Sequence, residues 1–167
     1  MNVRQREAGM LVTKAFHCKA FNDAARTAEF VASTDVVDAY GEIVDQQSWQ
    51  LGDFLKNPVI LFAHQSRELP IGRARDVGVR TGQLECLIEF ATEELNPKAE
   101  QVWKMLRAQY LRAVSVGFVP TNGRYEVRDG NEVWVWSGCV LKEISVTSVP
   151  ANPEALAKMK AFFVGED

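Results

Sequence analysis

Three side chains in this 167-residue sequence are of types that could take part in catalysis, each considered separately: Ser115, His64 and Glu143. A serine hydroxyl is a weak nucleophile unless a neighbouring imidazole accepts its proton, and that imidazole works best when an acid holds its other nitrogen. These residue types make a hydrolase one hypothesis. For each residue, a purely structural role is the alternative.

His64 follows the apolar segment 59–63 and precedes the polar segment 65–68, so we expect it where a strand leaves the core. A continuous apolar run of this length is typical of a strand that is buried on both faces. Strand ends that feed loops are places where a rigid frame presents reactive groups. The structural alternative is a half-buried histidine that is hydrogen-bonded to the backbone.

Ser115 lies in the apolar segment 113–118, which we expect to be a strand. A buried hydroxyl costs free energy unless it forms a hydrogen bond, so bonding to neighbouring backbone is the structural alternative for this residue. Gly117 follows on the same face of the strand and, having no side chain, leaves that face open above the hydroxyl. A peptide carbonyl needs such room to approach a nucleophile.

Glu143 occupies the next expected strand, 141–149, where strict alternation places it on one face with Leu141. A carboxylate on a sheet needs a cation or an imidazole as its partner, so a salt bridge at the sheet surface is the alternative to a catalytic role. The hydroxyls of Ser145 and Ser148 are interpreted as structural.

The remaining reactive side chains give weaker signals. Cys86 and Cys139 lie in apolar strand contexts, where free cysteine is usually inert packing, although a cysteine hydrolase that pairs one of them with His64 stays an alternative. Three separated cysteines and two histidines favour neither a disulfide framework nor a zinc site. The acidic residues of segment 35–45 lack the spacing of a calcium loop, and no nucleotide-binding motif is present. We therefore predict no metal and no cofactor.

The composition predicts an ordinary globular protein. The formal net charge is −3, with 47% hydrophobic and 25% charged residues, and the absence of a Lys/Arg run disfavours nucleic-acid binding. Apolar runs such as 58–63 are far shorter than the ~20 residues of a membrane span, and the first residues lack the apolar region of a secretory signal. We expect one domain, 1–167, of cytoplasmic type that binds neither nucleic acid nor membrane.

Apolar periodicity and turn signals predict many short strands and few helices. Strands are expected at 11–21, 27–33, 59–63, 71–74, 83–90, 113–120, 124–128, 132–140 and 141–149. Helices are expected at 48–55 after a Ser48 cap, at 96–110 after an Asn96 cap, and from Pro153 onward, with a loop at 35–42. This order predicts a mainly β fold with surrounding helices: a small closed or nearly closed, mostly antiparallel β-barrel of about seven strands.

Taken in order, six segments resemble the prohead (capsid maturation) serine protease family of tailed bacteriophages. They are 38–45 (DAYGEIVD), 57–64 (NPVILFAH), 70–72 (PIG), 115–118 (SVGF), 141–145 (LKEIS) and 150–153 (PANP). The resemblance covers a core of residues 27–160, whereas the N-terminal segment 1–26 matches poorly.

The resemblance implies a fold similar to the herpesvirus assembly proteases and a nucleophilic pair formed by Ser115 and His64. Related viral proteases use a histidine as the third member. Because no histidine follows His64 in this chain, the resemblance leaves that role to an acid, with Glu143 as the candidate, or to no residue. The backbone near residues 151–152 is predicted to supply an oxyanion-hole donor.

The same resemblance implies a serine endopeptidase with phage scaffold and major capsid proteins as substrates, acting inside the immature capsid in the host cytoplasm and also on itself. It is compatible with a homo-oligomer. The main alternative is a non-enzymatic capsid or scaffold assembly component that kept the barrel and lost catalysis.

Overall fold

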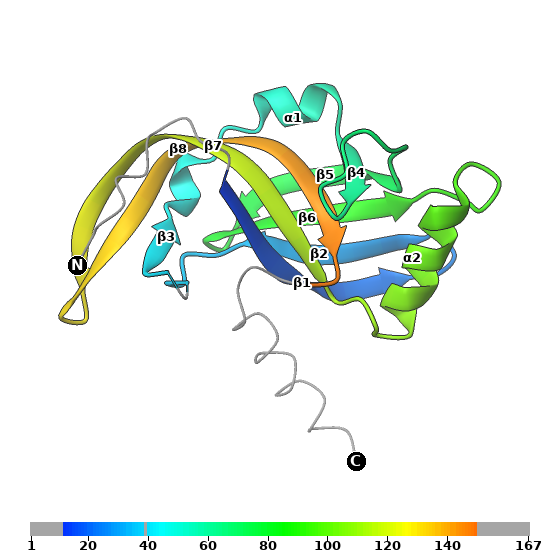
Figure 1. The fold of residues 1–167 in the computed structure, drawn as a ribbon, viewed down its shortest axis with the longest axis horizontal. Helices are drawn as coiled ribbons and strands as arrows, with labels where there is room; N and C mark the ends of the chain where they lie inside the picture. Colours follow the sequence, from blue (N-terminus) through cyan, green and yellow to red (C-terminus); the bar gives the residue numbers. More distant parts are fainter. Residues whose placement is uncertain (1–11, 39, 150–167) are drawn as a thin grey trace, which may run out of the picture.

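The protein folds mainly as β-sheet, with two α-helices outside the sheet in the part of the chain that the structure describes (Figure 1). The structure is a computed structural model, and it describes residues 12–38 and 40–149. The elements are β1 (Val12–Asn22), β2 (Thr27–Ser33), β3 (Glu42–Val44), the 3-10 helix η1 (Gln46–Ser48), α1 (Gly52–Lys56), β4 (Val59–Phe62), β5 (Gly72–Arg80), β6 (Gln83–Phe90), α2 (Pro97–Arg107), β7 (Ala113–Arg128) and β8 (Asn131–Thr147). The predicted mainly β class is confirmed.

The strands form one sheet in the order β3–β8–β4–β5–β6–β2–β1–β7, and β7 also pairs with β8. Most neighbours are antiparallel, but β3 and β4 each lie parallel to β8. β3 contacts an early part of β8, near Trp134, whereas β4 contacts a late part, near Ser145. The end of β4, which His64 follows, therefore lies beside the end of β8.

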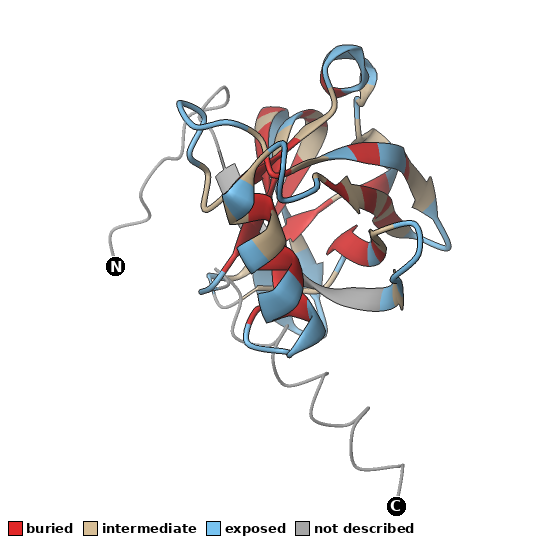
Figure 2. Ribbon diagram, turned by 90° about the vertical axis from the view of Figure 1, so that its right-hand side faces the viewer, coloured by how far each residue is buried: buried red, intermediate tan, exposed pale blue. Residues whose placement is uncertain are grey.

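Alternating burial along the strands builds the hydrophobic core. In β6 every second residue is buried, namely Leu84, Cys86, Ile88 and Phe90, as the two-residue period of a strand dictates. β4 instead buries two consecutive residues, Ile60 and Leu61, which agrees with its continuous apolar sequence. Figure 2 shows buried segments gathered in the strands and exposed segments in the loops.

Helix α2 begins as its sequence predicts. The Asn96 side chain accepts a hydrogen bond from the amide of Lys98 at 3.1 Å, and Pro97 occupies the first turn. Its buried residues, which join the core, are Ala99, Val102, Trp103 and Leu106. The helix ends at Arg107, so the predicted extension to residue 110 is wrong, and Tyr110 is 77% exposed.

Two predictions for residues 35–55 are wrong. The loop predicted at 35–42 overlaps the start of β3, a strand that the sequence patterns did not predict. The three residues of β3 are buried and pair with β8. Ser48 does not cap α1. It ends η1, where its hydroxyl donates to the carbonyl of Asp45 at 2.7 Å. Helix α1 begins only at Gly52.

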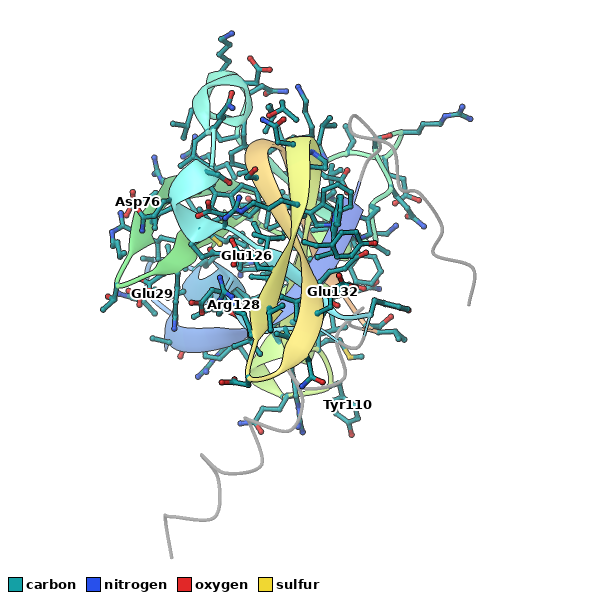
Figure 3. The ribbon with its side chains drawn as sticks, turned by 90° about the vertical axis from the view of Figure 1, so that its left-hand side faces the viewer. Glu29, Asp76, Tyr110, Glu126, Arg128 and Glu132 are labelled. Carbon is teal, nitrogen blue, oxygen red and sulfur yellow. The ribbon has the colours of Figure 1, made fainter. Side chains whose placement is uncertain are left out.

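Four predicted strands merge into the long hairpin of β7 and β8, which pair from Ala113 and Thr147 out to Arg128 and Asn131. The distal part of this hairpin, residues 120–140, is called the arm below. It extends from the rest of the sheet, with β3 along it (Figure 1) and its tip towards the viewer in Figure 3. The helix predicted from Pro153 lies outside the described residues.

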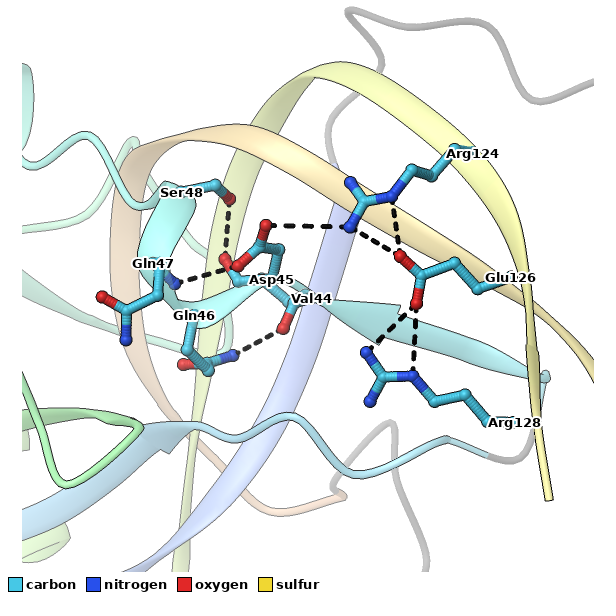
Figure 4. A network of polar contacts seen from close by, with 8 residues as sticks. All are labelled: Val44, Asp45, Gln46, Gln47, Ser48, Arg124, Glu126 and Arg128. Carbon is cyan, nitrogen blue, oxygen red and sulfur yellow. Dashed lines mark hydrogen bonds and ion pairs between the residues drawn. The ribbon is translucent and has the colours of Figure 1, made fainter.

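Charged side chains of the arm form a network that reaches the residue after β3 (Figure 4). Arg124 lies 2.7 Å from Glu126 and 4.0 Å from Asp45, and Arg128 lies 3.3 Å from Glu126. The hydrogen bond from Arg124 holds the pKa of the Glu126 carboxyl below its ordinary value, against the opposing effect of desolvation. This network links the arm to the loop between β3 and η1.

Candidate active site

A β-bulge in β8 decides which side chains share a face at the site. Gly117 pairs with Glu143 and Phe118 pairs with Leu141, so Lys142 is an extra residue on β8. Leu141 therefore joins the core with Phe118, while Glu143 lies on the opposite face. Strict alternation predicts that Leu141 and Glu143 share a face, and this prediction is wrong because a bulge interrupts the alternation.

Because Gly117 has no side chain, the Glu143 side chain can lie directly against β7. A Cβ atom at position 117 would lie 2.5 Å from Cγ of Glu143 and 3.1 Å from its Oε1. These separations are too short for an added methyl group, so the carboxylate side chain packs directly on the backbone of β7. The space that the sequence predicts above the Ser115 hydroxyl is thus partly filled by Glu143.

His64 lies in a sharp turn that follows β4. Ala63 and His64 have φ values of 51° and 60°, in the left-handed region that residues with a Cβ rarely adopt and that is enriched at functional sites. The amide of Ala63 donates to the carbonyl of Val146 at 2.8 Å, and the amide of His64 donates to the hydroxyl of Ser145 at 3.2 Å. Both bonds tie the turn to the end of β8.

The imidazole of His64 contacts the carboxylate of Glu143. Nδ1 of the ring and Oε1 of the carboxylate form a hydrogen bond. The side chains are 32% and 17% exposed, respectively, so the contact is partly shielded from solvent. A carboxylate at Nδ1 favours the tautomer that keeps its proton there, which leaves Nε2 free to accept a proton from another group.

Ser115 lies on β7 beside this pair. It is the register partner of Ser145 and only 2% of its surface is exposed. Residues directly opposite each other on antiparallel strands have Cβ atoms about 5 Å apart, so the side chains of Ser115 and Ser145 are neighbours on one face. Between the described Ser115 and His64 side chains there is no hydrogen bond. The fold nevertheless brings Ser115, His64 and Glu143 to the same end of the β7–β8 pair.

Ser145 is the site residue that sequence reasoning missed. Ser145 is fully buried and is the register partner of Ser115, and its hydroxyl accepts a hydrogen bond from the amide of His64. The two-residue spacing from Glu143 to Ser145 was the available signal, because that spacing places both side chains on one face of a strand. A serine in a strand, considered alone, does not indicate a position in an active site.

The other sequence candidates lie apart from this cluster. Cys86 and Cys139 belong to the hydrophobic core, an apolar environment that disfavours a thiolate, whereas Ser115 lies on the face that carries the carboxylate partner of His64. The predicted oxyanion donors at 151–152 lie outside the described residues. Over the described ranges, no three His, Cys, Asp or Glu side chains are grouped to hold a metal ion. No helix within these ranges is long and apolar enough to cross a membrane.

A mainly β fold that carries a serine beside a hydrogen-bonded histidine–carboxylate pair is an arrangement that serine hydrolases can use. The sequence model of the caudovirus prohead serine proteases matches residues 30–164. The chain belongs to this family.

Two known proteins are similar to this chain, one in sequence and one in fold. The prohead protease of Escherichia phage T5 is 27% identical over 140 residues, a match that covers 81% of this chain and 63% of the T5 protein. The structure of the bacteriophage T4 capsid assembly protease is similar with a TM-score of 0.63 and 11% identity, over 86% of this chain and 100% of that one. At this identity the T4 likeness concerns the fold.

Proposed function

We propose that the protein is a serine endopeptidase that cleaves scaffold and major capsid proteins, and itself, during prohead maturation. The observation that carries the proposal is the hydrogen bond between His64 and Glu143 on the face where Ser115 lies. Membership of the prohead serine protease family and the similarity in sequence to the T5 prohead protease support this substrate class. The reaction then takes place inside the immature capsid in the host cell.

In the proposed mechanism, His64 is the general base and Ser115 the nucleophile. Nε2 of His64 accepts the proton of the Ser115 hydroxyl as Oγ attacks the carbonyl carbon of the scissile peptide bond. Glu143 accepts the hydrogen bond from Nδ1 and stabilises the imidazolium that forms. His64 then donates the proton to the leaving amine, and a water molecule hydrolyses the acyl-enzyme by the same route. The bond from serine to histidine is often long without substrate and shortens in the complex.

We also propose that the sheet is the small barrel that the sequence predicts. The strand order runs from β8 through β4, β5, β6, β2 and β1 to β7, and β7 pairs again with β8. Pairing of this kind leaves few exposed strand edges. The barrel gives Ser115 and Glu143 a rigid support, because both belong to its β7–β8 pair.

The experiment that tests this function combines labelling with processing. The protein is treated with a serine-directed phosphonate and, separately, mixed with scaffold and major capsid proteins of the same phage. We expect phosphonate labelling and discrete cleavage products from the wild type and neither from Ser115→Ala. A non-enzymatic assembly component would bind these proteins without being labelled and without cutting them.

A further inference from the structure

The hydroxyl of Ser145 links the strand that carries Glu143 to the turn that carries His64. It accepts the hydrogen bond of the His64 amide at 3.2 Å, and none of the Ser145 surface is exposed. Ser145 is also the register partner of Ser115. The residue thus contacts or adjoins each member of the proposed triad while being closed off from solvent.

β8 holds His64 at two points. Glu143 binds the ring through Nδ1, and Ser145 binds the backbone amide. Because these two residues are two apart on one strand, both anchors belong to the same rigid element. The backbone anchor matters here because His64 and Ala63 occupy the left-handed region, which persists only where surrounding contacts hold it.

We propose that Ser145 is a positioning residue of the active site, whose hydroxyl holds the left-handed turn at His64 and thereby orients the imidazole between Glu143 and Ser115. This inference rests on the proposed serine protease function. Ser145 acts through His64, because the hydrogen bond of its hydroxyl is made with the His64 amide.

Removal of the hydroxyl leaves the His64 amide without its acceptor, and the turn then relaxes towards commoner backbone conformations. The imidazole moves with it. A displacement of about 1 Å in a catalytic group can lower turnover on the order of 10²-fold. Substrate binding is unaffected by this change, so kcat falls while KM stays nearly constant.

The test compares Ser145→Ala and Ser145→Cys with the matched control Ser33→Ala. Ser33 is equally buried and its hydroxyl also accepts a hydrogen bond, from Nε2 of Gln46 at 2.9 Å, but on β2. For each variant of the full chain, kcat and KM are measured on a scaffold-derived peptide, together with the unfolding temperature. The proton NMR signal of the His64 Nδ1–H provides a direct readout of the ring's hydrogen bond.

We expect Ser145→Ala to lower kcat about 10–10²-fold with KM almost unchanged, and to shift or broaden the His64 signal. Ser145→Cys keeps more of the turnover than Ser145→Ala, because a thiol sulfur can still accept a hydrogen bond from the His64 amide, although weakly. Ser33→Ala keeps both the wild-type kcat and the wild-type signal, even where its unfolding temperature falls as much.

A folded Ser145→Ala with kcat within about twofold of the wild type and an unshifted His64 signal overturns the proposal. If the alanine variant does not fold, Ser145→Cys decides in the same way. Should the wild type prove inactive, the NMR signal alone decides: a shift specific to the Ser145 variants supports the positioning role while the protease function fails.

Discussion

The two ends of the β7–β8 hairpin hold polar side chains in different ways. On the arm, Arg124, Glu126 and Arg128 hold one another by ion pairs, with side chains 31–49% exposed. At the site, one carboxylate and one hydroxyl of β8 hold His64, and the Glu143 side chain is only 17% exposed.

The two ends differ in how far the position of their polar side chains depends on special backbone geometry. Exposed ion pairs are screened by solvent and contribute little individually, so the arm network tolerates rearrangement. The site depends on three backbone features: the bulge at Lys142, the bare Gly117 and the left-handed turn at His64. We therefore expect substitutions at the site to change activity far more than stability, and substitutions on the arm to change activity hardly at all.

The largest effect is expected for Ser115→Ala. Loss of the nucleophile lowers turnover on the order of 10⁶-fold, as for other triad knockouts, while the unfolding temperature stays close to that of the wild type. Processing of capsid protein and thermal unfolding measure the two quantities, with Ser33→Ala as the buried-serine control. Comparable processing by Ser115→Ala would reduce Ser115 to an ordinary strand residue.

His64→Ala should be nearly as inactive, because the variant loses the imidazole that donates to Glu143 and is proposed to accept the Ser115 proton. His17→Ala should retain activity, since the sequence places that histidine in the poorly matched N-terminal segment. Peptide turnover of the two variants is compared at one pH. An active His64→Ala beside an inactive His17→Ala would reverse the assignment of the base.

Glu143→Gln should lower turnover about 10²–10⁴-fold, because an amide can present a donor to Nδ1 and reverse the tautomer of His64. The controls are Asp35→Asn, Asp38→Asn and Asp45→Asn, which alter acidic residues outside the site. A crippled aspartate variant together with a nearly normal Glu143→Gln would move the third member to that acidic segment.

Gly117→Ala should resemble Glu143→Gln in activity, because the new methyl group displaces the Glu143 side chain. The double variant Gly117→Ala/Glu143→Gln should then lose little beyond either single variant, since both act through the same carboxylate. Turnover of all three variants forms the double-mutant cycle. Fully additive losses would show that Gly117 acts independently of Glu143.

The smallest effect is expected for Glu126→Gln on the arm, with activity unchanged. The pKa of Glu126 is lowered in the folded protein, first by the hydrogen bond from Arg124. Its carboxylate therefore stabilises the fold above the carboxyl's ordinary pKa, and this contribution is lost as pH falls through the lowered pKa. The free energies of unfolding of the wild type and the variant should differ slightly at neutral pH and become equal in acid. A difference that grows in acid contradicts this sign.

Local sequence patterns were sufficient to predict the start of α2 and most strands. They also indicated Ser115, His64 and Glu143 as candidates, whose catalytic roles stay a prediction. Asn96 and Pro97 act through their immediate neighbours, and the alternation in β6 is a local property. The bulge at Lys142 depends instead on how β8 aligns with a strand that is distant in sequence. The turn at Ala63 and His64 is likewise set by acceptors on β8, about eighty residues later. The proposed role of Ser145 depends on this turn, so the spacing from Glu143 could indicate only that the two side chains share a face.

The most direct test of the account is to locate the phosphonate adduct by peptide mass mapping of the labelled full chain. The account predicts a single adduct on Ser115, formed by the wild type and lost in His64→Ala, because the hydroxyl is reactive only beside its base. An adduct on Ser145 or Ser148, or labelling of Ser115 that persists in His64→Ala, would contradict the assignment of the Ser115–His64–Glu143 site.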